Sequence, residues 1–122
     1  LGVFLVDPRA AGVTLERVES TTLEPLSIVT LAGAQVAGDD VLGDPARGGA
    51  IVAWIAQRAL AGLCSLQAGV CEAALRLTAR HVSEREQFNV KIATFQAVAH
   101  RAADAYIDTE AVTLTARLAA WR

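Results

Sequence analysis

The feature that most constrains this chain is an apolar run with helical spacing from Ala50 to Ser83. Apolar side chains recur there at steps of three and four, and a second apolar set lies between them, so that only a narrow stripe is polar. A long helix that is apolar on two faces must be covered on most sides, which one partner helix cannot do. We therefore predict a helix that belongs to a bundle and lies at a subunit interface.

A second helical pattern follows a short connection. The turn between the two patterns is expected inside residues 83 to 94, so the second helix should return antiparallel to the first. Its apolar face is formed by Ile92, Phe95, Ala99, Ala103, Ile107, Ala111, Leu114, Leu118 and Trp121.

The first 45 residues have the composition of β-strands instead. Residues 3–6 and 13–18 are rich in β-branched side chains, and the turn-forming residues 7–12 separate them, which predicts two successive strands. A third strand is expected over residues 28–36, before breaks at Gly38 and at Gly43-Asp44-Pro45. Three strands leave open edges, so further strands from this chain or another are implied. The predicted fold class is α+β, with an incomplete antiparallel β-barrel or sheet followed by two long antiparallel helices.

Composition excludes several classes of function. The 122 residues are 53% hydrophobic and 20% charged, which is enough for a folded core. A formal charge of -2 and arginines spread along the chain argue against a nucleic-acid partner. No charged-then-apolar leader opens the sequence and Arg58 interrupts the apolar run, so we predict no membrane span and a cytoplasmic location. Because methionine is absent even from position 1, we expect a piece of something longer.

The two cysteines and two histidines do not form a metal site. Cys64 and Cys71 lie seven residues apart in the long helical pattern, too far apart for a disulfide, and we predict both as buried small hydrophobes. No His or Cys stands at ligand spacing from them, so no metal is expected. His100 and Asp104 are spaced for an i, i+4 pair on the second helix, and we predict a structural role for this histidine.

Function is expected at the connection between the two helical patterns. Arg85-Glu86-Gln87-Phe88-Asn89 places a cation, amides and a large aromatic side chain where a simple helix connection needs only small polar residues. From Arg85 to Asp104 the pattern Arg-x-Gln-Phe-x-x-x-Ile-x-x-Phe-Gln-Ala-Val-x-His-x-x-Ala-Asp resembles the Arg-x-x-Phe-Gly and Phe-Gln-x-Val-x-His stretch of the acyl-CoA dehydrogenase family. The resemblance extends back through Gly69 to residues 31–36 and 41–43.

The resemblance implies a domain organisation and a cofactor. Residues 1–45 would be the C-terminal strands of the family's middle β-domain, and residues 46–122 the first two helices of its C-terminal four-helix bundle. The implied cofactor is FAD, bound mainly by a neighbouring subunit of a homo- or hetero-oligomer. Arg85 would reach the FAD diphosphate, Phe88 would lie against its adenosine side, and Gln96 and Gln87 would donate or accept hydrogen bonds.

Each of these residues also has a simpler interpretation. Arg85 ends the first helix, where a cation caps free carbonyls. Phe88 alone is typical of a core residue, and Gln96 alone of a surface amide at a helix start. Asn89 stands where the family has Gly, and among other residues Asn tolerates a left-handed backbone best.

The reaction implied by the resemblance is α,β-dehydrogenation of an acyl-CoA thioester, which needs a carboxylate base. In one branch of the family the base lies beyond the position matching Arg122, and in another it falls on Ala59 here, so we predict no catalytic residue in these 122 residues. Three interpretations stay open: part of an acyl-CoA dehydrogenase, a non-catalytic partner subunit of a heteromeric acyl-CoA dehydrogenase, or a cofactor-free helical interaction module. The acyl group cannot be identified.

Overall fold

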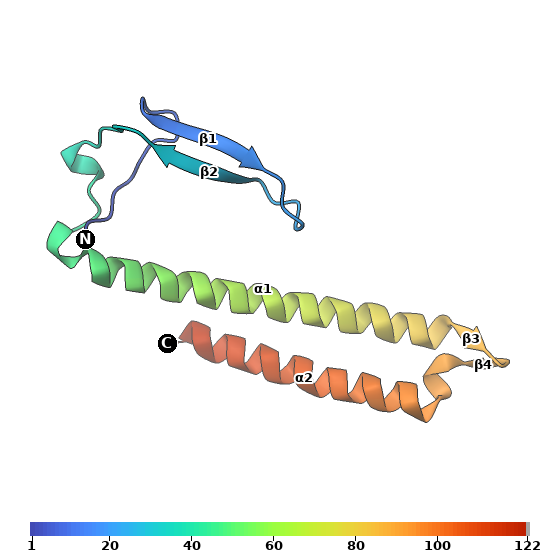
Figure 1. Ribbon diagram of the computed structural model, residues 1–122. Helices are drawn as coiled ribbons and strands as arrows, with labels where there is room; N and C mark the ends of the chain where they lie inside the picture. Colours follow the sequence, from blue (N-terminus) through green and yellow to red (C-terminus); the bar gives the residue numbers. More distant parts are fainter. Residues whose placement is uncertain (122) are drawn as a thin grey trace. The chain divides into compact units, whose positions relative to one another are not determined.

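The computed structural model describes residues 1–121, and the chain divides into two compact units, Leu1–Trp54 and Ile55–Arg122. The first unit contains an antiparallel pair of strands, β1 (Val13–Val18) and β2 (Leu26–Leu31), and the start of helix α1 (Gly48–Glu84). The second contains the rest of α1, a hairpin of β3 (Glu86–Gln87) and β4 (Val90–Lys91), and helix α2 (Gln96–Trp121) (Figure 1). The predicted α+β class, with antiparallel strands followed by two long antiparallel helices, is confirmed.

Strand β1 coincides with the predicted segment 13–18. It pairs antiparallel with β2 in a register that places Val13 opposite Leu31 and Val18 opposite Leu26. The strand predicted over 28–36 begins two residues earlier and ends at Leu31, because Gly33 adopts a positive φ of 68° that turns the chain out of the sheet.

The strand predicted over residues 3–6 is wrong. Phe4 forms an isolated antiparallel bridge with Val41, supported by backbone hydrogen bonds from Leu5 N to Asp40 O and from Leu42 N to Val3 O. The partner of β1 is the later segment β2, and a β-rich composition alone does not specify which segment a strand pairs with. The loop over residues 7–12 therefore does not connect two strands of one sheet.

The two strands leave their apolar side chains uncovered within the described chain. All six residues of β2 are exposed, including Ile28 and Val29 at 54% and 58% of their maximum. A two-stranded sheet exposed on both faces is marginal by itself, in agreement with the expectation that further strands are needed.

Helix α1 begins where the sequence predicts a break. Asp44 has an extended backbone, and its Oδ1 accepts a hydrogen bond from the amide of Ala46 at 2.8 Å. Pro45 occupies the first position of a short 3₁₀ turn, η2 (Pro45–Arg47), which runs directly into α1. An Asp followed by Pro is a favourable helix start, because the carboxylate satisfies a free amide and proline has none to satisfy.

Helices α1 and α2 lie side by side and antiparallel, and residues of both line shared grooves (Figure 1). Only small side chains are buried between them: Ala68 on α1, and Thr109 and Ala116 on α2. The Thr109 hydroxyl donates to the carbonyl of Ala105 at 2.7 Å, so its burial leaves no unsatisfied polar group. The two helices therefore meet along a narrow seam.

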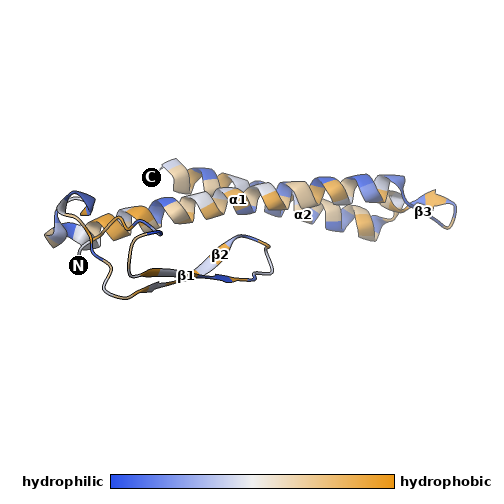
Figure 2. Cartoon of the chain, turned by 90° about the horizontal axis from the view of Figure 1, so that it is seen from above, coloured by the Kyte–Doolittle hydropathy of each residue, from blue (hydrophilic) through white to orange (hydrophobic). Residues whose placement is uncertain are grey.

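Large apolar side chains of α1 lie outside this seam. Leu60, Leu63 and Leu66 are each at least 60% exposed, and apolar residues continue along most of the helix (orange in Figure 2). The predicted burial of the cysteines is wrong for the described chain, since Cys64 is exposed and Cys71 is half-buried. Within the unit that begins at Ile55, helix α2 leaves Cys64 exposed.

The apolar composition of α1 also affects the prediction that the chain has no membrane span. The continuous helical segment Pro45–Glu84 is long and apolar enough to cross a bilayer, with a mean hydropathy of 1.4 over its most apolar window. Length and composition do not separate a span from a central helix of a bundle, so the absence of a span stays a prediction.

Candidate functional site

The predicted functional segment forms a tight hairpin between the two helices. We call residues 84–96 the hairpin corner. Strands β3 and β4 pair antiparallel, with Gln87 opposite Val90, and the two loop residues Phe88 and Asn89 both have positive φ, 55° and 63°. Positive φ at both central residues is the signature of a type I′ turn. The expected left-handed backbone at Asn89 is confirmed, whereas the hairpin itself was not predicted.

Phe88 projects from the tip of the hairpin. Its side chain is 87% exposed, and its only aromatic contact among the described residues is edge-to-face with Phe95, at a centroid distance of 6.3 Å. The interpretation of Phe88 as a core residue is therefore wrong for the described chain. A large aromatic held in a backbone conformation that bulky residues rarely adopt requires a structural or functional reason.

Arg85 is fixed through its backbone and free at its side chain. Its amide donates to the carbonyl of His81 and its carbonyl accepts from the amide of Ile92, both at 2.9 Å. Its exposed guanidinium makes no hydrogen bond or ion pair with any residue from 1 to 121. The capping interpretation of Arg85 is not supported, because Lys91 Nζ donates to the last carbonyl of α1, on Glu84, at 3.1 Å.

The two glutamines flank the hairpin loop along the chain. Gln87 is the last residue of β3, and Gln96 is the first residue of α2, after a 3₁₀ turn η3 (Ile92–Thr94) and the extended Phe95. Both glutamine side chains are exposed. The hairpin thus gathers Arg85, Gln87 and Phe88 within one stiff connection, and Gln96 follows it at the start of the next helix.

An ion pair that the sequence reasoning missed joins the two strands. Lys91 Nζ lies 2.7 Å from Glu86 Oε1, and these residues are direct partners across the hairpin. The spacing was the available signal. Glu86 and Lys91 each stand two positions from the two-residue loop, and such residues face one another across a hairpin. That signal has meaning only once the hairpin is known.

The predicted pair of His100 and Asp104 does not form. No ion pair links these two side chains in the described structure, although they are one turn apart on α2. Spacing brings side chains to the same face of a helix, but exposed groups gain little by pairing and stay solvated.

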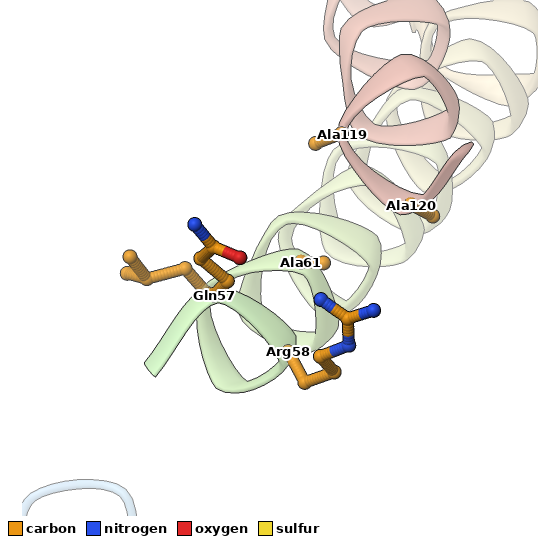
Figure 3. A pocket seen from close by; sticks show the side chains of 6 residues that line it. Gln57, Arg58, Ala61, Ala119 and Ala120 are labelled. Carbon is orange, nitrogen blue, oxygen red and sulfur yellow. The ribbon is translucent and has the colours of Figure 1, made fainter. Parts of the chain in front are cut away.

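A groove near the start of α1 contains the region where the resemblance would place an early catalytic carboxylate. It is lined by Gln57, Arg58, Leu60 and Ala61 of α1 and by Ala119 and Ala120 of α2, with a volume of about 390 Å³ (Figure 3). None of these six side chains is a carboxylate. The position that the resemblance implies for a base is Ala59, whose side chain cannot accept a proton.

Comparison with known proteins shows which family the chain belongs to. The model of the family described as "Acyl-CoA dehydrogenase, C-terminal domain" matches residues 47–122, which is more than half of the chain. The chain belongs to the acyl-CoA dehydrogenase family. The acyl-CoA dehydrogenase FadE27 of Mycobacterium tuberculosis (strain ATCC 25618 / H37Rv) is 39% identical over 98% of this chain and 31% of its own length.

Two solved structures superpose well on this chain. The ChsE4-ChsE5 complex from Mycobacterium tuberculosis has a TM-score of 0.90 at 36% identity, over 99% of this chain and 32% of the matched chain. The steroid ACAD Tcur3481-Tcur3483 has a TM-score of 0.83 at 38% identity, over 98% of this chain and 31% of the matched chain. The chain therefore spans about a third of the length of the acyl-CoA dehydrogenases that it matches.

Proposed function

We propose that these residues are part of an FAD-dependent acyl-CoA dehydrogenase that introduces an α,β double bond into an acyl-CoA thioester. The observation that carries the proposal is the hairpin corner of a family member, where Arg85 offers an unpaired guanidinium and Phe88 an exposed aromatic face. A planar cation binds a diphosphate well, and an exposed aromatic ring can pack against an adenosine.

The residues present fit one edge of a cofactor site and not a whole site. Arg85 would bind the diphosphate, Phe88 would lie along the adenosine side, and the amides of Gln96 and Gln87 would add hydrogen bonds. Because all four side chains are exposed, a flavin bound chiefly by another subunit can reach them. FAD, when bound, supplies the hydride acceptor of the reaction.

The proposed domain organisation follows from the same family membership. Residues 1–45 are assigned to the end of the middle β-domain and residues 46–122 to the first two helices of the C-terminal four-helix bundle. The match of the C-terminal-domain model to residues 47–122 supports this division. Further helices of the bundle would cover the exposed leucines of α1.

A second candidate is a partner subunit that completes the FAD site of a catalytic neighbour in a heteromeric enzyme. Two observations favour it. From Gly48 to Cys71 helix α1 contains no Asp or Glu, so the early position for a base is vacant in this segment. The ChsE4-ChsE5 and Tcur3481-Tcur3483 assemblies, which this chain resembles at 36% and 38% identity, each combine two proteins.

The test uses the full-length protein, expressed with its partner if it has one. Arg85→Ala should weaken FAD retention, because losing a charge-assisted contact to phosphate costs about 1.5 to 3 kcal/mol, roughly tenfold or more in affinity. Arg80→Ala is the matched control, since Arg80 is an exposed arginine near the end of α1 and lies outside the hairpin corner.

Visible flavin absorbance after dialysis, with the FAD dissociation constant from titration of the apoprotein, measures the effect. Retention of FAD by Arg85→Ala equal to that of the Arg80→Ala control would reject the proposed contact. A purified full-length protein without any flavin absorbance, and without affinity for added FAD, would favour the cofactor-free interaction module. A full-length sequence with no carboxylate base in a later helix would favour the partner-subunit candidate.

A further inference from the structure

Lys91 contacts both residues that flank Arg85 in the hairpin corner. It is the only lysine among the 122 residues, and its ammonium bridges the two residues that flank Arg85. Nζ donates to the carbonyl of Glu84 at 3.1 Å and lies 2.7 Å from the carboxylate of Glu86. The Lys91 side chain of β4 therefore contacts both the last residue of α1 and the first residue of β3.

The backbone of Arg85 is held between these two contacts. Its amide continues the helix by donating to His81, and its carbonyl accepts from Ile92, the residue after Lys91. Four contacts thus converge on three consecutive residues, two through Lys91 and two through the main chain. The guanidinium of Arg85 is left as the one unpaired cation of this stretch within residues 84–96.

The ion pair between Lys91 and Glu86 also changes the charges next to Arg85. Glu84 and Glu86 place a carboxylate on each side of the arginine, and a free carboxylate beside it would both attract the guanidinium and repel an approaching anion. The ammonium of Lys91 pairs with Glu86, which removes one of these competitors. A short cross-strand pair also restricts the hairpin on which Phe88 is mounted.

We propose that Lys91 is a positioning residue, which holds the hairpin corner so that Arg85 stays unpaired and directed toward the diphosphate of FAD. This inference rests on the proposed function of Arg85 and adds to it a residue that does not touch the cofactor. A purely stabilising cap on α1 would show the same contact to Glu84. The two roles differ in whether the effect of Lys91 on FAD depends on Arg85.

The experiment measures FAD affinity of the full-length apoprotein, with its partner subunit if it has one, for four variants: Lys91→Met, Lys91→Arg, Arg85→Ala and the double variant of Lys91→Met with Arg85→Ala. Lys91→Met keeps the aliphatic stem and removes the charge and the donors. Lys91→Arg keeps a cation that can reach the same two oxygens.

We expect Lys91→Met to weaken FAD binding by about three- to fivefold, the size of an exposed ion pair with a hydrogen bond, and Lys91→Arg to restore it to within about twofold. In the Arg85→Ala background Lys91→Met should have a smaller effect on FAD affinity, because the main group that Lys91 positions is gone. Hydrogen exchange of the apoprotein gives a readout free of the cofactor. Lys91→Met should speed exchange of the Ile92 amide, which donates to Arg85.

The possible failures are distinguishable. Equal losses of FAD affinity from Lys91→Met with and without Arg85 would overturn the positioning role and leave the proposed function intact. An unchanged Ile92 exchange in Lys91→Met would also overturn it, since the hairpin would be held without the ammonium. If Arg85→Ala itself does not change FAD affinity, the proposed cofactor contact is wrong, and the positioning role falls with it.

Discussion

At the scale of single residues, two of the described non-glycine residues with a positive φ, Phe88 and Asn89, are neighbours at the tip of the hairpin. A left-handed conformation places Cβ close to the carbonyl oxygen that follows it, which disfavours every residue except glycine and, to a lesser degree, Asn and Asp. Asn89 meets this requirement and Phe88 does not. The cost at Phe88 is sustained by the paired strands on either side, and by the edge-to-face contact with Phe95.

Substitution of Asn89 tests this explanation. Asn89→Gly should leave the stability of the full-length protein unchanged or slightly raised, because glycine adopts positive φ without steric cost. Asn89→Ala should lower the free energy of unfolding by about 1 kcal/mol. Denaturant unfolding measures both, and amide exchange at Val90 reports the hairpin directly. An alanine variant as stable as the parent would show that the turn does not depend on a left-handed residue.

At the scale of elements, α1 and α2 are much more apolar than their contact with each other requires. The seam between them buries Ala68, Thr109 and Ala116, all small, whereas Leu60, Leu63 and Leu66 remain exposed. The larger side chains of α1 are therefore available to pack against other elements. This excess of apolar surface agrees with the proposal that the two helices belong to a larger bundle.

The start of α1 is a point where one side chain controls an element. Asp44→Ala should lower the free energy of unfolding of the full-length protein by about 1 kcal/mol, since the amide of Ala46 loses its acceptor. Asp44→Ser should retain most of that stability, because a hydroxyl caps the same amide. Asp39→Ala, in the short 3₁₀ turn η1 (Gly38–Asp40), is the matched control. Thermal unfolding measures the series, and equal losses at positions 39 and 44 would contradict the capping role.

At the scale of the whole molecule, the described residues leave apolar surface of both units uncovered. Leu26 and Val29 of β2 and Leu77 of α1 are among the large exposed side chains, and β2 has an open edge. Soluble monomers rarely expose contiguous apolar surface on this scale. The chain spans about a third of the length of the acyl-CoA dehydrogenases that it matches.

The 122 residues produced alone should therefore not behave as a functional monomer. We expect aggregation or self-association, because the strand edges and the two apolar faces of α1 have no partners among the described residues. We also expect no oxidation of acyl-CoA, since Ala59 stands at the position implied for a base and the proposed FAD contacts form only one edge of a cofactor site. Light scattering beside a dye-linked assay with a panel of acyl-CoA thioesters and added FAD tests both expectations. Turnover by a clean monomer would refute the proposal that these residues depend on the rest of an enzyme.

Local patterns determined a large part of this structure. The helical period located both long helices, with the first expected from Ala50 and observed from Gly48, and the preference of Asn for positive φ identified the backbone at position 89. Each of these features depends on residues that are neighbours along the chain or one helical turn apart. The motif from Arg85 to Asp104 likewise led to the family that the comparisons confirm.

Only the tertiary structure decided which distant residues meet. β-branched residues at 3–6 are as suited to a strand as those at 26–31, but β1 pairs with the later segment, because strand partners are chosen by non-local geometry. Lys91 reaches Glu84 and Glu86 only because the chain reverses at Phe88 and Asn89. His100 and Asp104 are one helical turn apart but do not form an ion pair in the described structure. Both side chains are exposed, and exposed charges gain little free energy from pairing.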